Sequence, residues 1–380
     1  MIQYYKFFKG LYFDLPIPTS VSINLTNKCN QHCIYCEIGQ GLIKTNQPLI
    51  TLHDLKWIIR EMNKVKISSL CLGGGEPLLF KEIFELIQYA HDFGIKCEIL
   101  TNGMLLDRLS QDQLDIFHKC NTGISVSIDS FSNEKEELIR GVSGALTQPI
   151  KGIKKILNNN INVGINTVIS SYNYDCLFDL VKNADEMGIY QIKFQPVIFI
   201  SNYPENDPIP NKKNLNITPE NLPEIKKQFG DILNYQKNSK IKTNTNLLDK
   251  WFFDYINYLY SQKKEKIFFK KVLNRFWCGT IYNTIFINYY GQILPCNMLK
   301  PKESIKDSDN NPENKNLLDL WNKSTESIRK GIKNEIYPDE CRSCVCSFDH
   351  NLLCSMFKYP IANHNNISYF FELLLENIKK

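Results

Sequence analysis

The sequence has no long run of apolar residues. None of its hydrophobic stretches approaches the roughly 18 residues that a helix needs to cross a bilayer. The aromatic N-terminal stretch, residues 1–14, contains Lys6 and Lys9 and lacks the apolar core and small-residue cleavage site of a secretory signal. We therefore expect a protein that neither spans a membrane nor is exported.

The sequence also has little excess of either charge. Its 45 Lys and Arg residues stand against 40 Asp and Glu residues, a net charge of +5 over 380 residues. So mild an imbalance does not predict binding to nucleic acid. A basic and aromatic patch, residues 263–271, is more simply a solvated helix face than a contact for RNA or an anionic surface. We expect no nucleic-acid partner.

Cysteine is the residue type whose placement is unusual. The 13 cysteines are odd in number and clustered, which indicates a reducing, cytoplasmic location and not a disulfide scaffold. Cys29, Cys33 and Cys36 form the pattern C-x3-C-x2-C after a short β-like run, residues 20–26. Three thiolates on a [4Fe–4S] cluster leave one iron without a protein ligand, and an open position is typical of catalytic metal sites. A zinc loop with His32 as fourth ligand, or a chance cluster, are the alternatives.

Strand-like and helix-like patterns alternate six times along the first half of the chain. Alternation of this kind indicates a parallel sheet with right-handed crossovers. The hydrophobic content of 43% is ample for a core. We predict an α/β fold, an open (βα)6 partial barrel. The predicted strands cover residues 20–26, 68–72, 95–100, 124–128, 161–169 and 190–196, and the helices residues 51–65, about 79–90, 106–117, 146–157 and 177–186.

Three features lie at or after the expected carboxyl ends of strands, where parallel sheets bind ligands. The run from Gly73 through Gly74 and Gly75 to Glu76 would let backbone approach a ligand closely, although it could be a plain tight turn. A second feature is the pair Ser127 and Asp129, which strand alternation places on one face. The third is Arg140, whose guanidinium could bind a carboxylate bidentately. A strand-end cap and a surface arginine are the simpler interpretations of these two.

The cysteine pattern, with Tyr35 before its last cysteine, resembles the signature of the radical S-adenosylmethionine (radical SAM) superfamily. The resemblance implies that S-adenosylmethionine chelates the open iron and is cleaved reductively to a 5′-deoxyadenosyl radical. It also implies cofactor-binding roles: the methionine amino group for the glycines and Glu76, the ribose for Ser127 and Asp129, and the carboxylate for Arg140. We further expect Asn166 and Gln195 to face the adenine, although core or solvent positions suit them equally. The residues so assigned are Cys29, Cys33, Cys36, Tyr35, Gly74, Gly75, Glu76, Ser127, Asp129 and Arg140.

A second set of cysteines follows residue 277. Cys278 and Cys296 flank a hairpin signal, and Cys341 and Cys344 add a C-x2-C pair. The arrangement resembles the SPASM/twitch subgroup of radical SAM enzymes, which implies an auxiliary 4Fe–4S cluster on these four residues. We expect the shorter twitch form, because Cys346 and Cys354 depart from the full SPASM spacing; both remain possible ligands. A structural zinc site on four of the six, with or without His350, is the alternative.

These observations predict three regions: a radical SAM core (1–200), a helical linker (201–276), and a small α+β cysteine-rich domain with a C-terminal helix (277–380). We expect a radical SAM oxidoreductase in which the auxiliary cluster takes an electron from the substrate or orients it. A flavodoxin or ferredoxin would supply electrons. The substrate would be a peptide or protein, or a small polyol or amino sugar; the few residues before the first strand weaken the peptide interpretation. An epimerase with a cysteine hydrogen donor and a non-catalytic electron carrier are the alternatives.

Overall fold

The computed structural model describes residues 18–42, 47–197, 212–249, 252–260, 280–296, 299–306, 312–333 and 338. Within these residues ten strands form one sheet in the order β10-β9-β8-β1-β2-β3-β4-β5-β6-β7. Neighbouring strands from β1 to β6 are parallel, as the alternating pattern predicts. They are β1 (Ser20–Thr26), β2 (Ser69–Gly74), β3 (Lys96–Thr101), β4 (Gly123–Ser127), β5 (Val163–Ile169) and β6 (Gln191–Pro196).

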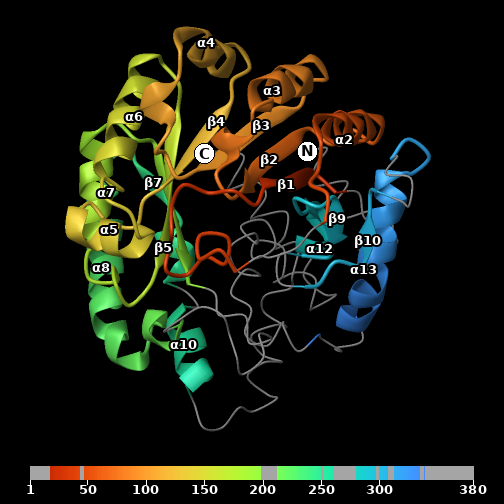
Figure 1. Cartoon of the computed structure of the whole chain (residues 1–380). Helices are drawn as coiled ribbons and strands as arrows, with labels where there is room; N and C mark the ends of the chain where they lie inside the picture. The colour runs from red at the N-terminus through yellow and green to blue at the C-terminus, as the bar shows by residue number, and fades with distance from the viewer. Residues whose placement is uncertain are drawn as a thin grey trace, which may run out of the picture.

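Helices follow these strands and lie in an arc outside the sheet (Figure 1). The predicted open α/β barrel is confirmed in this part of the chain. The helices between β1 and β6 are α2 (Leu52–Lys64), α3 (Ile83–Asp92), α4 (Gln111–Lys119), α5 (Asn133–Arg140), α6 (Thr147–Asn158) and α7 (Leu177–Glu186).

Helix α2 shows how local sequence and packing agree. Thr51 and Asp54 form a reciprocal capping box that satisfies orphan backbone donors at the helix start. The apolar stripe of the helix, from Leu55 through Ile58 to Met62, is fully buried. The cap and the apolar stripe together fix this helix, predicted over residues 51–65, against the sheet.

Two predicted helix starts are wrong by several residues, and one helix between β1 and β6 was not predicted. Pro77–Leu79 form a 3₁₀ turn capped by Glu76, so α3 starts at Ile83. Ser110 forms a capping box with Gln113, so α4 starts at Gln111, after a 3₁₀ turn at Leu106–Arg108. Helix α5 is short and strongly polar, and it lacks the apolar stripe that identified its neighbours. It nevertheless carries Arg140.

The predicted hairpin is present and extends the same sheet. Strand β8 (Thr284–Ile287) pairs parallel with β1, and β9 (Gln292–Leu294) turns back antiparallel beside β8. Gly291 in the turn has φ of +77°, a conformation that glycine adopts without strain. Because β8 is parallel to β1, the hairpin turn lies at the same end of the sheet as the cysteine loop.

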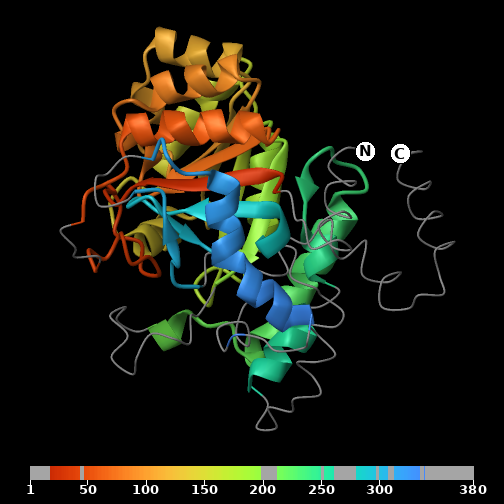
Figure 2. The same ribbon diagram turned by 90° about the vertical axis from the view of Figure 1, so that its right-hand side faces the viewer.

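The remaining described elements cover the two ends of the sheet. Short strands β7 (Lys242–Thr243) and β10 (Glu303–Ser304) are its edges. Helix α13 (Leu317–Lys333) contacts β9, β10 and α2, and Figure 2 shows it lying across this end of the sheet. The other helices are α8 (Leu222–Tyr235), α9 (Thr245–Leu248), α10 (Phe252–Tyr260) and α12 (Thr280–Asn283), with 3₁₀ turns at Lys212–Leu215 and Pro219–Asn221.

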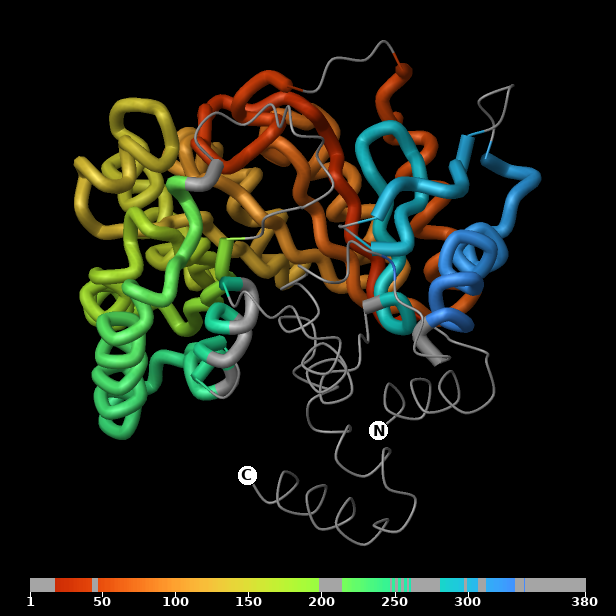
Figure 3. The backbone as a smooth tube through the Cα atoms, turned by 90° about the horizontal axis from the view of Figure 1, so that it is seen from below, coloured from red at the N-terminus to blue at the C-terminus, as the bar shows by residue number. Residues whose placement is uncertain are grey.

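The barrel is partial. Helices α8 and α13 lie at opposite ends of an open arc in Figure 3, and β7 and β10 are unpaired with each other. Among the described residues, we find no helix that combines the length and the apolar character required to cross a bilayer. Because the central strands are parallel, their carboxyl ends lie along one rim of the arc. The candidate site is at that rim.

Candidate active site

The three cysteines lie on the loop that follows β1. Backbone bonds attach this loop to the end of α5: His32 donates its N–H to the carbonyl of Arg140 at 2.9 Å, and Ile34 donates to Ile139 at 3.0 Å. Gly141 caps α5 with φ of +67°, and a Cβ there would stand 2.6 Å from the carbonyl oxygen of His32. The cysteine loop therefore packs against the end of α5, the helix that was not predicted.

Nitrogen donors are aimed at two of the three sulfurs. Asn102 places Nδ2 3.7 Å from Cys29 Sγ, and Arg140 places Nη1 3.9 Å from Cys33 Sγ. The backbone N–H of Gln31 also donates to Cys29. Burial raises the pKa of Cys29 and raises that of Cys33 to about 12, while Arg140 opposes the rise at Cys33. The two N–H donors at the half-buried Cys29 and the cation beside the buried Cys33 suit thiolate ligands, whose charge they would stabilise.

The arrangement of this loop bears on the cluster that the cysteine spacing predicts. No group of three or more His, Cys, Asp or Glu residues in the described chain is close enough to hold a single metal ion. Cys36 nevertheless lies near enough to Cys29 and to Cys33 to influence both thiols electrostatically. A [4Fe–4S] cube takes each thiolate on a different iron, so its cysteines surround it and need not meet at one point. The residues present therefore fit such a cluster better than a single zinc ion.

The glycine run after β2 packs directly on the start of the cysteine loop. A Cβ on Gly75 would stand 2.1 Å from the carbonyl oxygen of Lys28, and one on Gly74 2.8 Å from that of Thr26. The backbone N–H groups of Gly75 and Glu76 donate to Thr26 and Lys28, both at 2.8 Å. Side chains are excluded here by the close approach of two backbones, and the contact fixes the residue before Cys29.

Glu76 is completely buried, and protein groups bind its carboxylate. Its Oε1 accepts from the Thr101 hydroxyl at 2.8 Å and from the Leu78 N–H at 3.0 Å, and its Oε2 accepts from the Asn102 N–H at 2.8 Å. Burial raises the pKa of this carboxyl, and the three donors oppose the rise. In this structure Glu76 joins the end of β2 to the end of β3. Its predicted role toward the methionine amino group stays a prediction.

A buried ionic network lies beneath the cysteine loop. Asp129 accepts from the Tyr35 hydroxyl at 2.6 Å and from the Val168 N–H at 2.7 Å, and forms an ion pair with Arg140 at 2.9 Å. Arg140 also donates to Glu136 at 2.9 Å. Burial alone would lower the pKa of Arg140, but Asp129 and its other anionic neighbours raise it well above its ordinary value. Three residues predicted to bind S-adenosylmethionine are thus brought together and bind one another; their contacts with the cosubstrate stay predictions.

Ser127 and Asn166 face the inner side of the arc. They are paired directly between β4 and β5, and Gln195 on β6 pairs with Val168, two positions beyond Asn166. All three polar side chains are half-buried, while the alternate positions Val126 and Ile165 are buried under the helices. The contacts of these residues with the cosubstrate stay predictions.

Two aromatic residues that sequence reasoning treated only as a turn lie beside the cysteine loop. The carbonyl of Tyr289 accepts from Ile50 at 2.8 Å, and the ring of Tyr289 packs edge-on against that of Tyr290 at 4.6 Å. Burial, Tyr290, Glu37 and Cys36 together raise the pKa of Tyr289 to about 12. The adjacent aromatics before Gly291 were the available signal, but the sequence does not show that β8 pairs with β1.

The predicted auxiliary cysteines are mostly outside the described residues. Cys278, Cys341, Cys344, Cys346 and Cys354 lie there, and Cys296 is half-buried two residues after β9. Because β9 runs antiparallel to β8 and β1, Cys296 lies toward the amino end of β1, opposite the core cysteine loop. The auxiliary site stays a prediction.

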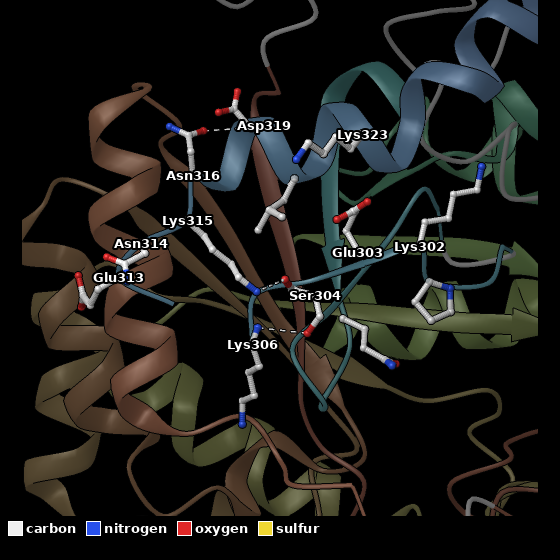
Figure 4. A pocket seen from close by; sticks show the side chains of 13 residues that line it. Lys302, Glu303, Ser304, Lys306, Glu313, Asn314, Lys315, Asn316, Asp319 and Lys323 are labelled. Carbon is white, nitrogen blue, oxygen red and sulfur yellow. Dashed lines mark hydrogen bonds between the residues drawn. The ribbon is translucent and has the colours of Figure 1, made fainter. Parts of the chain in front are cut away.

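A groove of about 820 Å³ lies between β10, the start of α13 and the residues just before α13, 313–316 (Figure 4). Two of its lysines are bound to neighbouring groups: Lys306 bonds to Asp54 at 3.3 Å and Leu49 at 2.8 Å, and Lys315 bonds to the Ser304 carbonyl at 3.2 Å. The groove is open and mixed in charge, and we assign no function to it.

Curated proteins match a little less than half of this chain. GTP 3′,8-cyclase of Clostridium perfringens (strain 13 / Type A) is 33% identical over 172 residues, which are 44% of this chain and 52% of that protein. The AdoMet-dependent heme synthase of Methanosarcina barkeri is 29% identical over 175 residues, 45% of this chain and 48% of that protein. The chain spans about half the length of the curated relatives it matches.

Solved structures resemble the fold over more of the chain. Streptococcus suis SuiB bound to precursor peptide SuiA is 19% identical with a TM-score of 0.62, and the match covers 88% of this chain and 71% of that one. Native anSMEcpe with bound AdoMet and Cp18Cys peptide is 15% identical with a TM-score of 0.59, covering 87% and 88%. The model of the Radical SAM superfamily matches residues 23–187, which contain the end of β1, the cysteine loop, the glycine run and β2 to β5. Residues 23–187 are therefore a radical SAM domain.

Proposed function

We propose that this radical SAM enzyme belongs to the SPASM/twitch subgroup and oxidises its substrate by two electrons, with an auxiliary 4Fe–4S cluster as the acceptor of the second electron. The observation that carries the proposal is the hairpin. Strands β8 and β9 continue the core sheet directly from β1, so that Cys296 belongs to the same rigid framework as the Cys29 loop. A structural zinc site would not require the hairpin to continue the core sheet.

The core site would hold its cofactors with residues from several strand ends. Cys29, Cys33 and Cys36 would bind the core cluster, and S-adenosylmethionine would complete the coordination of its open iron. Once bound, these groups supply a 5′-deoxyadenosyl radical that abstracts a hydrogen atom from the substrate. Ser127 and Asn166 would meet the cosubstrate on the inner face of the barrel. We assign Gly75 to the close backbone approach that this face requires.

Topology supports a substrate between two clusters. The core loop is at the carboxyl end of β1, and Cys296 lies toward its amino end. Strand β1 has 7 residues, so the two sites would be separated by about 20 Å. A substrate inside the barrel could face the core cofactors on one side and the auxiliary cluster on the other. The arrangement suits an electron acceptor that never contacts S-adenosylmethionine.

We favour a peptide or protein as the substrate. The matches to SuiB and anSMEcpe, whose structures contain peptides, extend beyond the radical SAM domain to more than four-fifths of this chain. The matches to the cyclase and the heme synthase cover less than half of it. A small polyol or amino sugar is the second candidate, because the half-buried polar residues Ser127, Asn166 and Gln195 would suit a hydroxylated substrate as well as a cosubstrate. A flavodoxin or ferredoxin would be the electron donor.

Formation of 5′-deoxyadenosine tests the enzymatic part of the proposal. Anaerobically reconstituted protein, reduced with dithionite and given S-adenosylmethionine, should release 5′-deoxyadenosine, and Cys36→Ala protein should release none. A non-catalytic electron carrier would take up iron and electrons but form no 5′-deoxyadenosine from either protein. That result would overturn the proposal.

Metal content tests the auxiliary cluster. Protein with Cys29→Ala, Cys33→Ala and Cys36→Ala together should keep about four irons per chain, one cube. Near-zero iron with about one zinc would instead make the C-terminal cysteines a structural clasp. The two-electron oxidation would then be wrong, and a redox-neutral reaction such as epimerisation with a cysteine hydrogen donor would replace it.

A further inference from the structure

The turn after β3, formed by Thr101, Asn102 and Gly103, is closely packed and held by side-chain hydrogen bonds. Gly103 has φ of +78°, and a Cβ on it would stand 2.8 Å from Val126 and 2.9 Å from Pro149. Thr101 accepts the N–H of Gly103 at 3.0 Å while its hydroxyl donates to Glu76. The residues on both sides of Asn102 are therefore held in place. This fixes the position of the Asn102 backbone from which its side chain extends.

The orientation of the Asn102 amide follows from its partners. Its Oδ1 accepts the backbone N–H of Met104 at 3.0 Å, and a backbone N–H can only donate. The nitrogen must then face the opposite way, where Nδ2 lies 2.7 Å from Asn30 Oδ1 and 3.7 Å from Cys29 Sγ. The two amide protons thus meet two acceptors. The side chain is buried, so water offers little competition for either proton.

The same residue connects Glu76 with the cysteine loop. Its backbone N–H donates to Glu76 at 2.8 Å, while its side chain reaches Asn30 and Cys29. A path of short contacts therefore runs from the buried carboxylate after β2, through the turn after β3, to the first cysteine after β1. The donors at Cys29 come from Asn102 and the backbone of Gln31. A neutral amide donor stabilises an anionic sulfur without adding a charge.

We propose that Asn102 is a positioning residue for the core cluster: its amide holds the Cys29 thiolate and raises the reduction potential of the cluster bound there. This inference rests on the proposed function, since it requires the cluster. Hydrogen bonds to the sulfurs of an iron–sulfur centre are one of the factors that set its potential. An N–H donor favours the more negative, reduced state, which is the state that must form before S-adenosylmethionine is cleaved.

Two substitutions separate this role from the role of Asn102 in the turn. A serine hydroxyl in Asn102→Ser can still accept from Met104, as short polar side chains do in such turns, but it is too short to reach Cys29. In Asn102→Asp one oxygen keeps the bond to Met104 and the other puts a negative charge where the donor was. Asn159→Ala is the control, because Asn159 caps the exposed end of α6.

The measurement is an anaerobic redox titration followed by electron paramagnetic resonance, using the reduced-cluster signal that changes when S-adenosylmethionine is added. At a fixed applied potential the ratio of reduced to oxidised cluster should fall about tenfold in Asn102→Ser, about 59 mV for a one-electron couple. It should fall further in Asn102→Asp and stay unchanged in Asn159→Ala. Iron content and the thermal midpoint of the apoprotein are measured on the same preparations.

The iron content, the reduction potential and the thermal midpoint together support or contradict the role of Asn102. Asn102→Ser protein that binds iron with an unchanged potential contradicts the inference and leaves the proposed function intact. If Asn102→Ser binds no iron but its apoprotein melts as the wild type does, the amide is needed to hold Cys29, and the inference stands. If the apoprotein melts early and binds no iron, Asn102 serves folding alone and the inference is wrong. Wild-type protein that binds iron without any signal that responds to S-adenosylmethionine would contradict the proposed function, and this inference with it.

Discussion

Substituting Gly75 by alanine should disable the core cysteine loop while leaving most of the fold intact. The new Cβ would stand 2.1 Å from the carbonyl oxygen of Lys28 and 2.7 Å from its carbonyl carbon. Real Cβ contacts begin near 3.0 Å, so one of the two backbones must move by about 0.9 Å. Gly75 is held by its hydrogen bond to the Thr26 carbonyl. We therefore expect the backbone of Lys28 and the adjoining Cys29 to shift.

The energetic cost follows from the same geometry. Forcing a methyl group into a fully packed contact costs about 1–3 kcal/mol, and here it must displace backbone and not a flexible side chain. The displacement also tilts Cys29 away from its donors. We expect a lowered thermal midpoint of the apoprotein, less than half of the wild-type iron of the core cluster, and a matching loss of 5′-deoxyadenosine.

Gly230 supplies the matched control. It lies inside α8, and a Cβ there meets nothing within 4 Å. Gly230→Ala should therefore stabilise the helix by about 0.5–1 kcal/mol and leave iron content unchanged. Gly75→Ala protein with wild-type iron and an unshifted midpoint would refute the claim that the glycine run is needed for backbone approach. Loss of iron in both variants would show that the assay reports general fragility.

Three further substitutions test the network and the helix cap. Arg140→Leu leaves Asp129 and Glu136 as buried unpaired carboxylates, so unfolding free energy should fall by about 3–5 kcal/mol in denaturant titration, and a fall under 1 kcal/mol would contradict the buried ion pairs. Tyr35→Phe removes the donor at 2.6 Å from Asp129 and should cost about 1.5–3 kcal/mol by the same assay, whereas no change would show that water replaces the hydroxyl. Thr51→Ala breaks the α2 capping box and should cost about 1 kcal/mol while iron content is unchanged; a loss of iron would link this helix to the site.

The sequence predicts the fold well where one face of an element is apolar. Periodicity predicts the six parallel strands, and helix α7 has the predicted bounds. Prediction fails at α5, where Glu134, Glu136 and Arg140 break the apolar stripe. Two of these charged residues, Glu136 and Arg140, are buried, because they pair with each other and with Asp129. A buried ionic network depends on partners far apart in the chain, and no local pattern reports it.

The same limit applies to the candidate site. Residue types and spacing identify Cys29, Cys33 and Cys36, because the geometry of a metal centre limits which spacings can bind it. They do not reveal that Asn102 faces Cys29, since that contact joins residues 73 positions apart. Nor do they show Tyr289 beside the cysteine loop, because that proximity depends on the pairing of β8 with β1. The motif names the ligands, and tertiary packing supplies their surroundings.

The buried position of Glu76 has a consequence for how this site would bind its cosubstrate. Three protein donors use three of the about four acceptor positions of the carboxylate, and the side chain is completely buried, so a ligand amino group could reach it only by moving a group that covers it. The Asn102 N–H cannot leave without moving the amide that contacts Cys29. The Thr101 hydroxyl can rotate toward another acceptor at little cost. Binding of an amino group at Glu76 should therefore proceed by rotation of Thr101, with the Asn102 turn and its hold on Cys29 unchanged.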